Sequence, residues 1–378
     1  LVEVPLISNL NFSAGQAPFP NKVDVSLSPS GAIKLYNQNG QVSVVGDVVG
    51  YYSTASLSEL HTRLAEQDAR IAALEAKLAD VTVLDVEGHR TFRFSGVNVQ
   101  VVDGSGDSAC NVNDFESCNG RGNLIVGYSE NPQSTATRTG SHNVVVGVDH
   151  SWSSHSGVVA GVSNRITGAA ASVVGGIRNH ATGSTAAVLG GNDNWAEGAG
   201  STITGGTNNE ARSVYATVSG GNGNAATEIQ SWVGGGNNNT ASGLLAAVSG
   251  GAGNTASGGF SSISGGRSGN AVGEFSSLSG GHDNTASGDY SSVSGGRNGV
   301  ASGEFAAIAG GNANQATSTA SSVAGGSNNT ASAQNSSVAG GLLNDANGGN
   351  DSVAGGGGVV CSVANVARVC GDGIGGPL

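Results

Sequence analysis

A fifteen-residue unit repeats through residues 156–357 and constrains the fold of this chain more than any other feature. One copy reads "SSVSGGRNGVASGEF" over residues 291–305, and the next copy, "AAIAGGNANQATSTA", follows at once. When each unit is numbered from the residue two before its apolar anchor, position three is aliphatic in every unit from Val158 to Val353. Such a repeat specifies one turn of a coil rather than a domain with a single compact core.

Two further positions of the unit are almost invariant. Position eleven is Ile166 in the first unit and alanine in the twelve units that follow, and positions five and six are Gly-Gly from Gly175-Gly176 onward. Two short apolar strands and glycine-rich corners in each unit predict an all-β fold, a parallel β-solenoid (β-roll) of about fourteen turns. The stretch between Pro132 and Pro377 holds no proline, as expected where the N–H groups of each turn pair with the next turn.

Position nine is occupied almost entirely by two residue types. It is Asn in eleven units and Gly at Gly269 and Gly299. Because Asn and Gly share a tolerance of positive φ, we predict a left-handed turn at position nine. One aliphatic residue and one alanine per turn make a narrow interior, so we also expect neighbouring coils to supply further buried apolar area.

Residues 54–82 follow a seven-residue apolar period. This period predicts a coiled coil, and the simplest partner helix is another copy of the chain. Seven of the eight seam positions are apolar, and the eighth, the polar Gln67, sets the register. The mixture of Leu, Ile and Val in the seam leaves the number of helices in the coiled coil open. The seam residues are Leu57, Leu60, Leu64, Gln67, Ile71, Leu74, Leu78 and Val81.

The rest of the chain divides into three segments. Residues 1–53 alternate apolar and polar residues and predict a small β domain with a thin core. Residues 83–155 predict a β-rich transition, in which Gly127 and Gly147 mark two early copies of the repeat separated by an insertion. Residues 358–378 predict a disulfide-closed C-terminal cap.

The four cysteines fall into two pairs. Cys110 and Cys118 are separated by seven residues, and Cys361 and Cys370 by eight. These spacings do not match zinc ligand sets, and they favour two short-loop disulfides over four buried thiols. Disulfides predict an oxidising environment, outside the cell or at its surface.

The charge of the chain excludes some partners. The net charge is −12, and only 11% of the residues are charged. No basic stripe is available for phosphate groups, so we expect no nucleic-acid partner. No apolar run approaches the roughly 20 residues of a membrane span.

One loop has the spacing of a calcium site. Positions one, three, five, nine and twelve of the calcium-loop pattern are occupied, but the sixth-position Gly is missing. We therefore prefer a polar, disulfide-closed loop and keep calcium as the alternative; no other cofactor is expected. The candidate ligands are Asp103, Ser105, Asp107, Asn111 and Asp114.

The sequence favours no catalytic site. Asp149, His150 and His155 match no common metal spacing, and we interpret them as turn residues. The seven histidines are scattered, so a nucleophile triad is not supported. The few acids of the repeat recur with its period, which indicates surface positions rather than a paired-carboxylate site.

One recurrent cluster is a candidate ligand-binding surface. Acids recur at position fourteen, aromatic residues at position fifteen and bases at position seven. An aromatic column beside carboxylates could hold sugar rings, whereas packing between chains is the simpler interpretation. The acids and aromatics are Glu274, Phe275, Asp289, Tyr290, Glu304 and Phe305, and the bases are Arg267, His282 and Arg297.

Two stretches resemble known families. The "SSVAGG" and "NNTASA" motifs resemble the head repeats of trimeric autotransporter adhesins, and this resemblance implies left-handed β-rolls joined three at a time. The fifteen-residue period, the Gly-Gly corners and a coiled coil that precedes the roll depart from that family. "SNLNFSAGQ" and "GDVVGYY" resemble a β module of bacterial, especially actinobacterial, surface proteins.

Together these patterns predict a homotrimeric extracellular structural fibre or surface filament that is not an enzyme. End-to-end joining of trimers through residues 371–378 is a further hypothesis, and its alternative is that this tail folds back along its own roll. The alternative is an adhesin or phage-type fibre head that binds glycans on a host surface through the roll. A polysaccharide-cleaving trimeric β-helix enzyme is a weaker alternative.

Overall fold

The computed structural model describes residue 30 and residues 54–110, 118–130, 136–362 and 369–370. The chain forms two compact units, residues 1–98 and 99–378, and each is considered by itself. The predicted N-terminal β domain, apart from Ser30, lies outside the described residues, as does the tail at residues 371–378.

The described part of the first unit, residue 30 and residues 54–98, contains one helix and one hairpin. Helix α1 (Thr54–Lys77) covers the predicted heptads as far as Leu74. Strands β1 (Val81–Val86) and β2 (His89–Phe94) pair antiparallel, with Val81 opposite Phe94. The prediction that Val81 continues the helical seam is therefore wrong, because the backbone of this residue pairs with β2.

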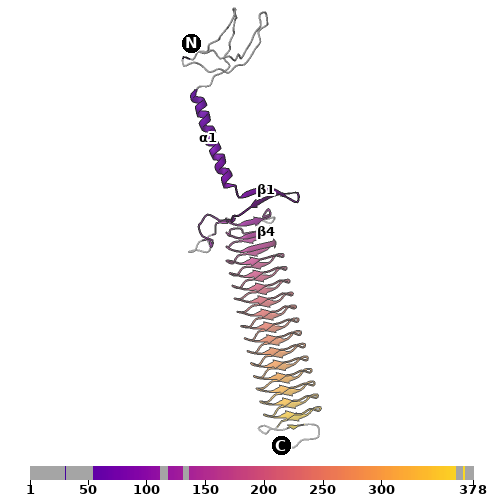
Figure 1. Ribbon diagram of the computed structural model, residues 1–378. Coiled ribbons are helices and arrows are strands. Elements are labelled where there is room, and N and C mark those ends of the chain that lie inside the picture. The colour runs from indigo at the N-terminus through magenta and orange to yellow at the C-terminus, as the bar shows by residue number, and fades with distance from the viewer. Residues whose placement is uncertain (1–29, 31–53, 111–117, 131–135, 363–368, 371–378) are drawn as a thin grey trace, which may run out of the picture. The chain divides into compact units, whose positions relative to one another are not determined.

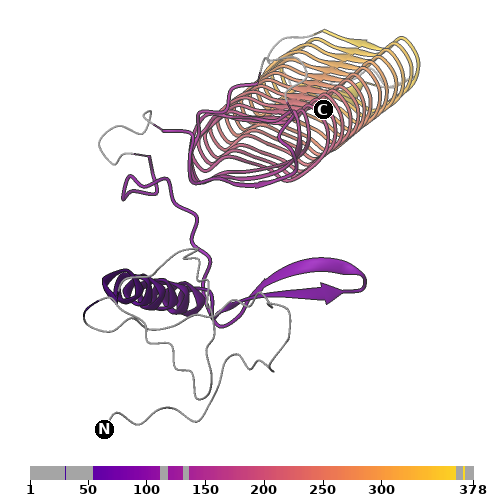
Figure 2. The ribbon, with the colours of Figure 1, turned by 90° about the horizontal axis from the view of Figure 1, so that it is seen from above.

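The second unit is a parallel β-solenoid, and the predicted fold is confirmed at this level (Figure 1). Each turn adds one short strand to each of two parallel sheets, and successive strands of a sheet come from successive turns (Figure 2). The first sheet stacks, in order, β3 (Leu124–Val126), β4 (Val144–Val148), β6 (Val158–Val162), β8 (Ser172–Val173), β10 (Ala187–Val188), β12 (Thr202–Ile203), β14 (Thr217–Val218), β16 (Trp232–Val233), β18 (Ala247–Val248), β20 (Ser262–Ile263), β22 (Ser277–Leu278), β24 (Ser292–Val293), β26 (Ala307–Ile308), β28 (Ser322–Val323), β30 (Ser337–Val338), β32 (Ser352–Val353) and β34 (Val369–Cys370).

The second sheet has 15 strands, one from each turn that begins with β4 to β32. Its strands carry position eleven of the repeat, as those of the first sheet carry position three. They are β5 (Ser151–Trp152), β7 (Arg165–Ile166), β9 (His180–Ala181), β11 (Trp195–Ala196), β13 (Glu210–Ala211), β15 (Ala225–Ala226), β17 (Thr240–Ala241), β19 (Thr255–Ala256), β21 (Asn270–Ala271), β23 (Thr285–Ala286), β25 (Val300–Ala301), β27 (Gln315–Ala316), β29 (Thr330–Ala331), β31 (Asp345–Ala346) and β33 (Val360–Cys361).

The solenoid begins before the strict repeat does. Leu124 of β3 pairs with Val144 of β4, so the two early copies predicted from the sequence are its first turns. In the next turn the buried anchor is Val159, which pairs with Val173, and the prediction of Val158 as the anchor is wrong. This turn is one residue shorter because it has the single glycine Gly161 where later turns have Gly-Gly.

A column of buried asparagines runs along the interior at position nine. The Nδ2 group of Asn224 donates to the carbonyl oxygens of Gly220, at 2.9 Å, and of Gly236 in the next turn, at 3.0 Å. Its Oδ1 atom accepts the backbone N–H of Asn239, also in the next turn, at 2.9 Å. We call this column the asparagine ladder. Each amide is fully buried, so its hydrogen bonds offset the cost of removing it from water.

The ladder replaces the left-handed turn predicted at position nine. None of the described residues at that position has positive φ. The left-handed residues are at position eight, such as Asp283 with φ of 55°, and at position fifteen. The N–H of Asp283 donates to the carbonyl of Arg267 in the preceding turn at 3.0 Å. The prediction was therefore wrong by one residue, since the corner lies just before the asparagine.

The two glycines at position nine leave space that larger anchors fill. A Cβ atom on Gly269 would lie 3.0 Å from Cδ1 of Leu278, and one on Gly299 would lie 3.7 Å from Cδ1 of Ile308. Both neighbours are position-three anchors of the following turn. Leucine and isoleucine thus occupy volume next to the missing amide.

The two glycines of the Gly-Gly corner have different roles. Gly281, the second, has φ of +88°, and a Cβ atom there would lie 2.2 Å from the carbonyl oxygen of Gly296. Around Gly280, the first, a Cβ atom would meet nothing within 4 Å. The second glycine therefore allows the turns to approach closely, while the position of Gly280 tolerates a side chain.

Both predicted disulfides are present. Cys110 bonds to Cys118, and Cys361 bonds to Cys370. Cys361 pairs in register with Ala346, and Cys370 with Val353. The second disulfide therefore takes the place of the alanine and the aliphatic anchor in the last turn, and it joins the two sheets across the interior.

We predict that Gly281→Ala lowers the stability of the solenoid by at least about 2 kcal/mol, since the new Cβ meets both a positive φ and a backbone oxygen. The adjacent Gly280→Ala variant is the matched control and should melt within about 0.5 kcal/mol of the wild type. Thermal unfolding followed by circular dichroism measures both. Equal melting of the two variants would contradict the assignment of the close approach to the second glycine.

We predict that Asn224→Gly costs about 2–4 kcal/mol, because it leaves a buried N–H and two carbonyl groups without their side-chain partners. Adding Val233→Leu, the anchor of the following turn, should recover part of this loss, as Leu278 does beside Gly269. Denaturant unfolding of the wild type, the single variant and the double variant measures the recovery. A neutral Asn224→Gly variant would show that the ladder contributes little.

Candidate functional site

The most distinctive surface of the roll is the corner formed by positions fourteen and fifteen. Residues at position fifteen adopt left-handed backbone, with φ of 56° at Phe275 and 58° at Tyr290. The N–H of Tyr290 donates to the carbonyl of Glu274 at 2.8 Å, and that of Phe305 to the carbonyl of Asp289 at 2.9 Å. The hydrogen bond to the preceding turn thus fixes a conformation that bulky residues rarely adopt.

Four aromatic rings stack along this corner. Neighbouring ring centroids lie 4.8, 5.0 and 5.0 Å apart, and the ring planes are within 15° of parallel. The left-handed backbone costs about 1–2 kcal/mol per residue, and stacking returns about 0.5–1.5 kcal/mol per pair. The rings, which we call the aromatic ladder, are Phe260, Phe275, Tyr290 and Phe305.

The predicted acids lie beside these rings. Glu274, Asp289 and Glu304 are exposed and occupy position fourteen of three successive turns. Asp289 accepts the backbone N–H of Glu274 through Oδ1 at 2.8 Å. Among residues 54–110, 118–130, 136–362 and 369–370, no cation forms an ion pair with any of the three. The structure therefore brings together all six residues that the sequence indicated.

The geometry of the rings limits what they can bind. Sugar rings stack on the face of an aromatic side chain, but here each inner ring covers the face of its neighbour. Each of the four residues is 42–52% exposed, and the exposed part therefore includes the edge of its ring. An edge surface is better suited to packing against another apolar surface than to stacking with a ligand.

The aromatic ladder belongs to a longer apolar ridge. Exposed apolar residues occupy positions fourteen and fifteen of the preceding turns as well, so that the same corner is apolar over about seven turns. Exposed apolar surface of this extent usually marks an interaction site. The apolar ridge consists of Val214, Tyr215, Ile229, Leu244, Leu245, Phe260, Phe275, Tyr290 and Phe305.

The predicted bases lie at the opposite corner of the same three turns. Arg267, His282 and Arg297 are bridged to one another in parallel register at position seven. His282 Nδ1 lies 2.8 Å from Asp283 Oδ2. The two strands of each turn separate this corner from the acids.

The predicted calcium loop is described only in part. Ser105 donates its N–H and its hydroxyl to Asp103 Oδ1, at 2.8 and 2.6 Å, and these bonds lower the pKa of Asp103. Asp107 Oδ1 accepts the N–H of Ala109 at 2.9 Å. Asn111 and Asp114 lie outside the described residues. Calcium coordination by this loop therefore stays a prediction.

The histidines near residue 150 have structural contacts. His150 is buried and occupies the ladder in a shorter turn: its Nδ1 accepts the N–H of Asn164 at 3.2 Å, and its Nε2 contacts the carbonyl of Val146 at 3.0 Å. Burial lowers the pKa of His150. Asp149 accepts the hydroxyl of Ser163 at 3.0 Å. His150 therefore fills the interior, and its interpretation as a turn residue is wrong; the absence of a metal at these residues stays a prediction.

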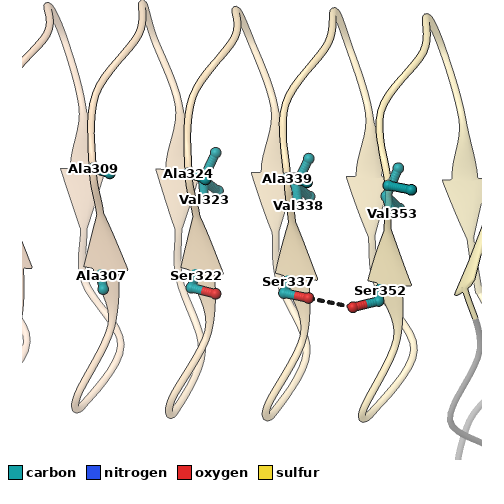
Figure 3. Close-up of a pocket in the computed structure, with 11 residues that line it drawn as sticks. Ala307, Ala309, Ser322, Val323, Ala324, Ser337, Val338, Ala339, Ser352 and Val353 are labelled. Carbon is teal, nitrogen blue, oxygen red and sulfur yellow. Dashed lines mark hydrogen bonds between the residues drawn. The ribbon is translucent and has the colours of Figure 1, made fainter.

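Two shallow hollows lie elsewhere on the roll. One, of about 380 Å³, includes His180, which stacks on Trp195 with ring centroids 3.8 Å apart. The other, of about 440 Å³, lies along a row of serines and alanines, where Ser337 and Ser352 hydrogen-bond across turns (Figure 3). Sequence reasoning missed the first, although His180 and Trp195 are fifteen residues apart and so share position ten.

Comparison with family models and with curated proteins finds no match to this chain. Within the described residues, no group of three or more metal-ligating side chains is gathered in a way that could hold an ion. No described helix has the length and apolar character needed to span a bilayer.

We predict that acid destabilises the solenoid partly through His150. Since its folded-state pKa lies below the ordinary value of 6.5, the unfolded chain takes up the proton first. Stability is then full above about pH 6.5 and declines as the pH falls from there toward the lower folded-state pKa. His150→Asn supplies an amide to the same ladder bonds and should lose less melting temperature between pH 7.5 and pH 5.

The matched control is His61→Asn on the exposed face of α1, which should retain the wild-type pH dependence. If His150→Asn and His61→Asn lose the same melting temperature on acidification, the proposed role of His150 is wrong.

Proposed function

We propose that this chain is an extracellular structural fibre protein that assembles as a homotrimer and has no catalytic role. The solenoid supplies a regular, extended scaffold, and the coiled-coil segment and the apolar ridge supply surfaces for other copies. The number three rests on the resemblance to the heads of trimeric autotransporter adhesins.

The observation that carries this proposal is the exposed seam of α1. Leu57, Leu64 and Ile71 are 41%, 54% and 53% exposed, although they form one apolar stripe. A stripe with heptad spacing is normally covered by a partner helix. A second copy of α1 has the same stripe and would cover it.

The two disulfides support an extracellular location. The bond between Cys361 and Cys370 closes the last turn, and the bond between Cys110 and Cys118 closes a short loop. Disulfides of this kind persist in oxidising surroundings and are rare in the cytosol. Joining of trimers end to end remains a further prediction, since the terminal segments lie outside the described residues.

Glycan binding is the second candidate function. Exposed aromatics beside carboxylates favour it, whereas the coverage of ring faces within the aromatic ladder does not. Binding at the acidic corner should depend on Tyr290 and Asp289, so loss of glycan-array signal in Tyr290→Ala would support it.

We predict that native mass spectrometry of the full chain gives three times the 36.8 kDa mass of one copy. Replacing Leu64 and Ile71 with lysine should weaken the assembly, because each copy then places charges in the seam. Glu66→Lys, off the seam, is the control and should leave the mass unchanged. A folded wild-type monomer at micromolar concentration would overturn the proposal.

A further inference from the structure

Charge is distributed along the roll in an unusual way. At position fourteen the only charged residues from Ala169 to Gly349 are Glu274, Asp289 and Glu304. At position seven the only basic residues from Val162 to Gly357 are Arg267, His282 and Arg297. Both sets occupy the same three turns, so every acid has a base on its own turn at the opposite corner.

The acids and the bases cannot pair with each other within one chain, and His282 instead lies 2.8 Å from Asp283 of its own turn. The acids follow the strands of the second sheet, and the bases follow the strands of the first, so that a full strand separates them in either direction along the turn. Within the acidic column the like charges are stacked one turn apart, about 4.8 Å along the axis, and repel each other; in the basic column the two arginines lie two turns apart, about 9.6 Å. A surface with the opposite column at the same spacing would relieve both repulsions.

The apolar ridge adds a second reason for a partner at the acidic corner. Phe275, Tyr290 and Phe305 lie next to the acids and are 42%, 50% and 52% exposed. Contact at this corner would bury the ring edges while it neutralises the carboxylates. Complementary charges then set the register, and buried apolar area supplies stability.

We propose that the acidic corner of one copy docks against the basic corner of the next copy, turn for turn, over residues 261–305. This inference deepens the proposed homo-oligomeric function and rests on it. In a cyclic assembly equivalent residues lie at the same height, so Glu274, Asp289 and Glu304 meet the bases of their own turns in the neighbour. The contact is heterologous, since two different corners meet, and it closes when the ring is complete.

Disulfide trapping in the full chain tests the register. Asn312 and Thr319 occupy positions seven and fourteen of the turn that follows Glu304. The variant with both residues changed to cysteine should form covalent oligomers under mild oxidation. Each single variant should stay monomeric on a denaturing gel, because like corners do not meet.

A mismatched pair provides the control. Ala252 is bridged to Asn312 through Arg267, His282 and Arg297 and therefore lies four turns away, about 19 Å along the axis. Ala252→Cys with Thr319→Cys should give no covalent oligomers. Equal trapping by the matched and mismatched pairs would overturn the proposed register.

Charge reversal in the matched cysteine background tests the cause. Replacing Glu274, Asp289 and Glu304 with lysine should abolish trapping, and replacing the three bases with glutamate as well should restore it. A control with Ser287, Ser302 and Thr317 changed to lysine places three lysines on the face of the second sheet instead and should trap normally.

The outcomes separate this inference from the proposed function. A wild type that is monomeric by native mass spectrometry overturns both. An oligomeric wild type whose trapping is unaffected by reversal of the acids overturns the corner contact alone, and leaves that corner to a bound cation or glycan. Loss of trapping on reversal, with recovery in the doubly reversed chain, supports the contact.

Discussion

The asparagine ladder is the interaction on which the rest of the solenoid depends. A turn with one aliphatic residue and one alanine buries little apolar area, so the narrow interior must be filled by something else. An asparagine side chain has both a donor and an acceptor, and the Nδ2 group of Asn224 bonds to Gly220 in its own turn and to Gly236 in the next. The ladder therefore converts a thin core into a continuous hydrogen-bonded one.

The ladder also explains what surrounds it. The amide reaches the backbone of the next turn only where turns approach closely, and the second glycine of each corner permits that approach. The corner residues before the ladder and at position fifteen take left-handed backbone, and their side chains point away from the interior. The fold thus leaves both corners free to vary, and the charged and aromatic columns occur there.

The sequence predicted the β-solenoid and the alignment of its core, because both depend on positions that repeat. It also predicted the two disulfide pairs, because the cysteines lie in two close pairs. It did not predict the role of position nine, because the alternation of Asn and Gly there has two explanations. Both residues tolerate positive φ, but an interior site can also accept either the Asn side chain or a Gly beside a larger anchor. One signal was present: Asp occurs at position eight, at Asp193 and Asp283, but never at position nine. A left-handed turn accepts Asp as readily as Asn, whereas the ladder requires the donor that Asp lacks.

The acidic and aromatic columns at positions fourteen and fifteen could also be predicted in part from the sequence. The period places Glu274 beside Phe275 and aligns both with the following turns, so the columns follow from the sequence alone. The stacking of the rings on one another, which covers their faces, required the backbone geometry at position fifteen. The choice of Val158 over Val159 failed because two adjacent valines fit the pattern, and only strand pairing distinguishes them.

Hydrogen exchange of asparagine side-chain amides tests the ladder most directly. Nuclear magnetic resonance of the full chain, labelled with ¹⁵N at asparagine and transferred to D₂O, separates buried from exposed amides. The account predicts that the Nδ2 signals of ladder residues such as Asn209, Asn224 and Asn239 persist, while those of the exposed Asn222, Asn237 and Asn298 disappear at once. Equally rapid loss of both sets would contradict it.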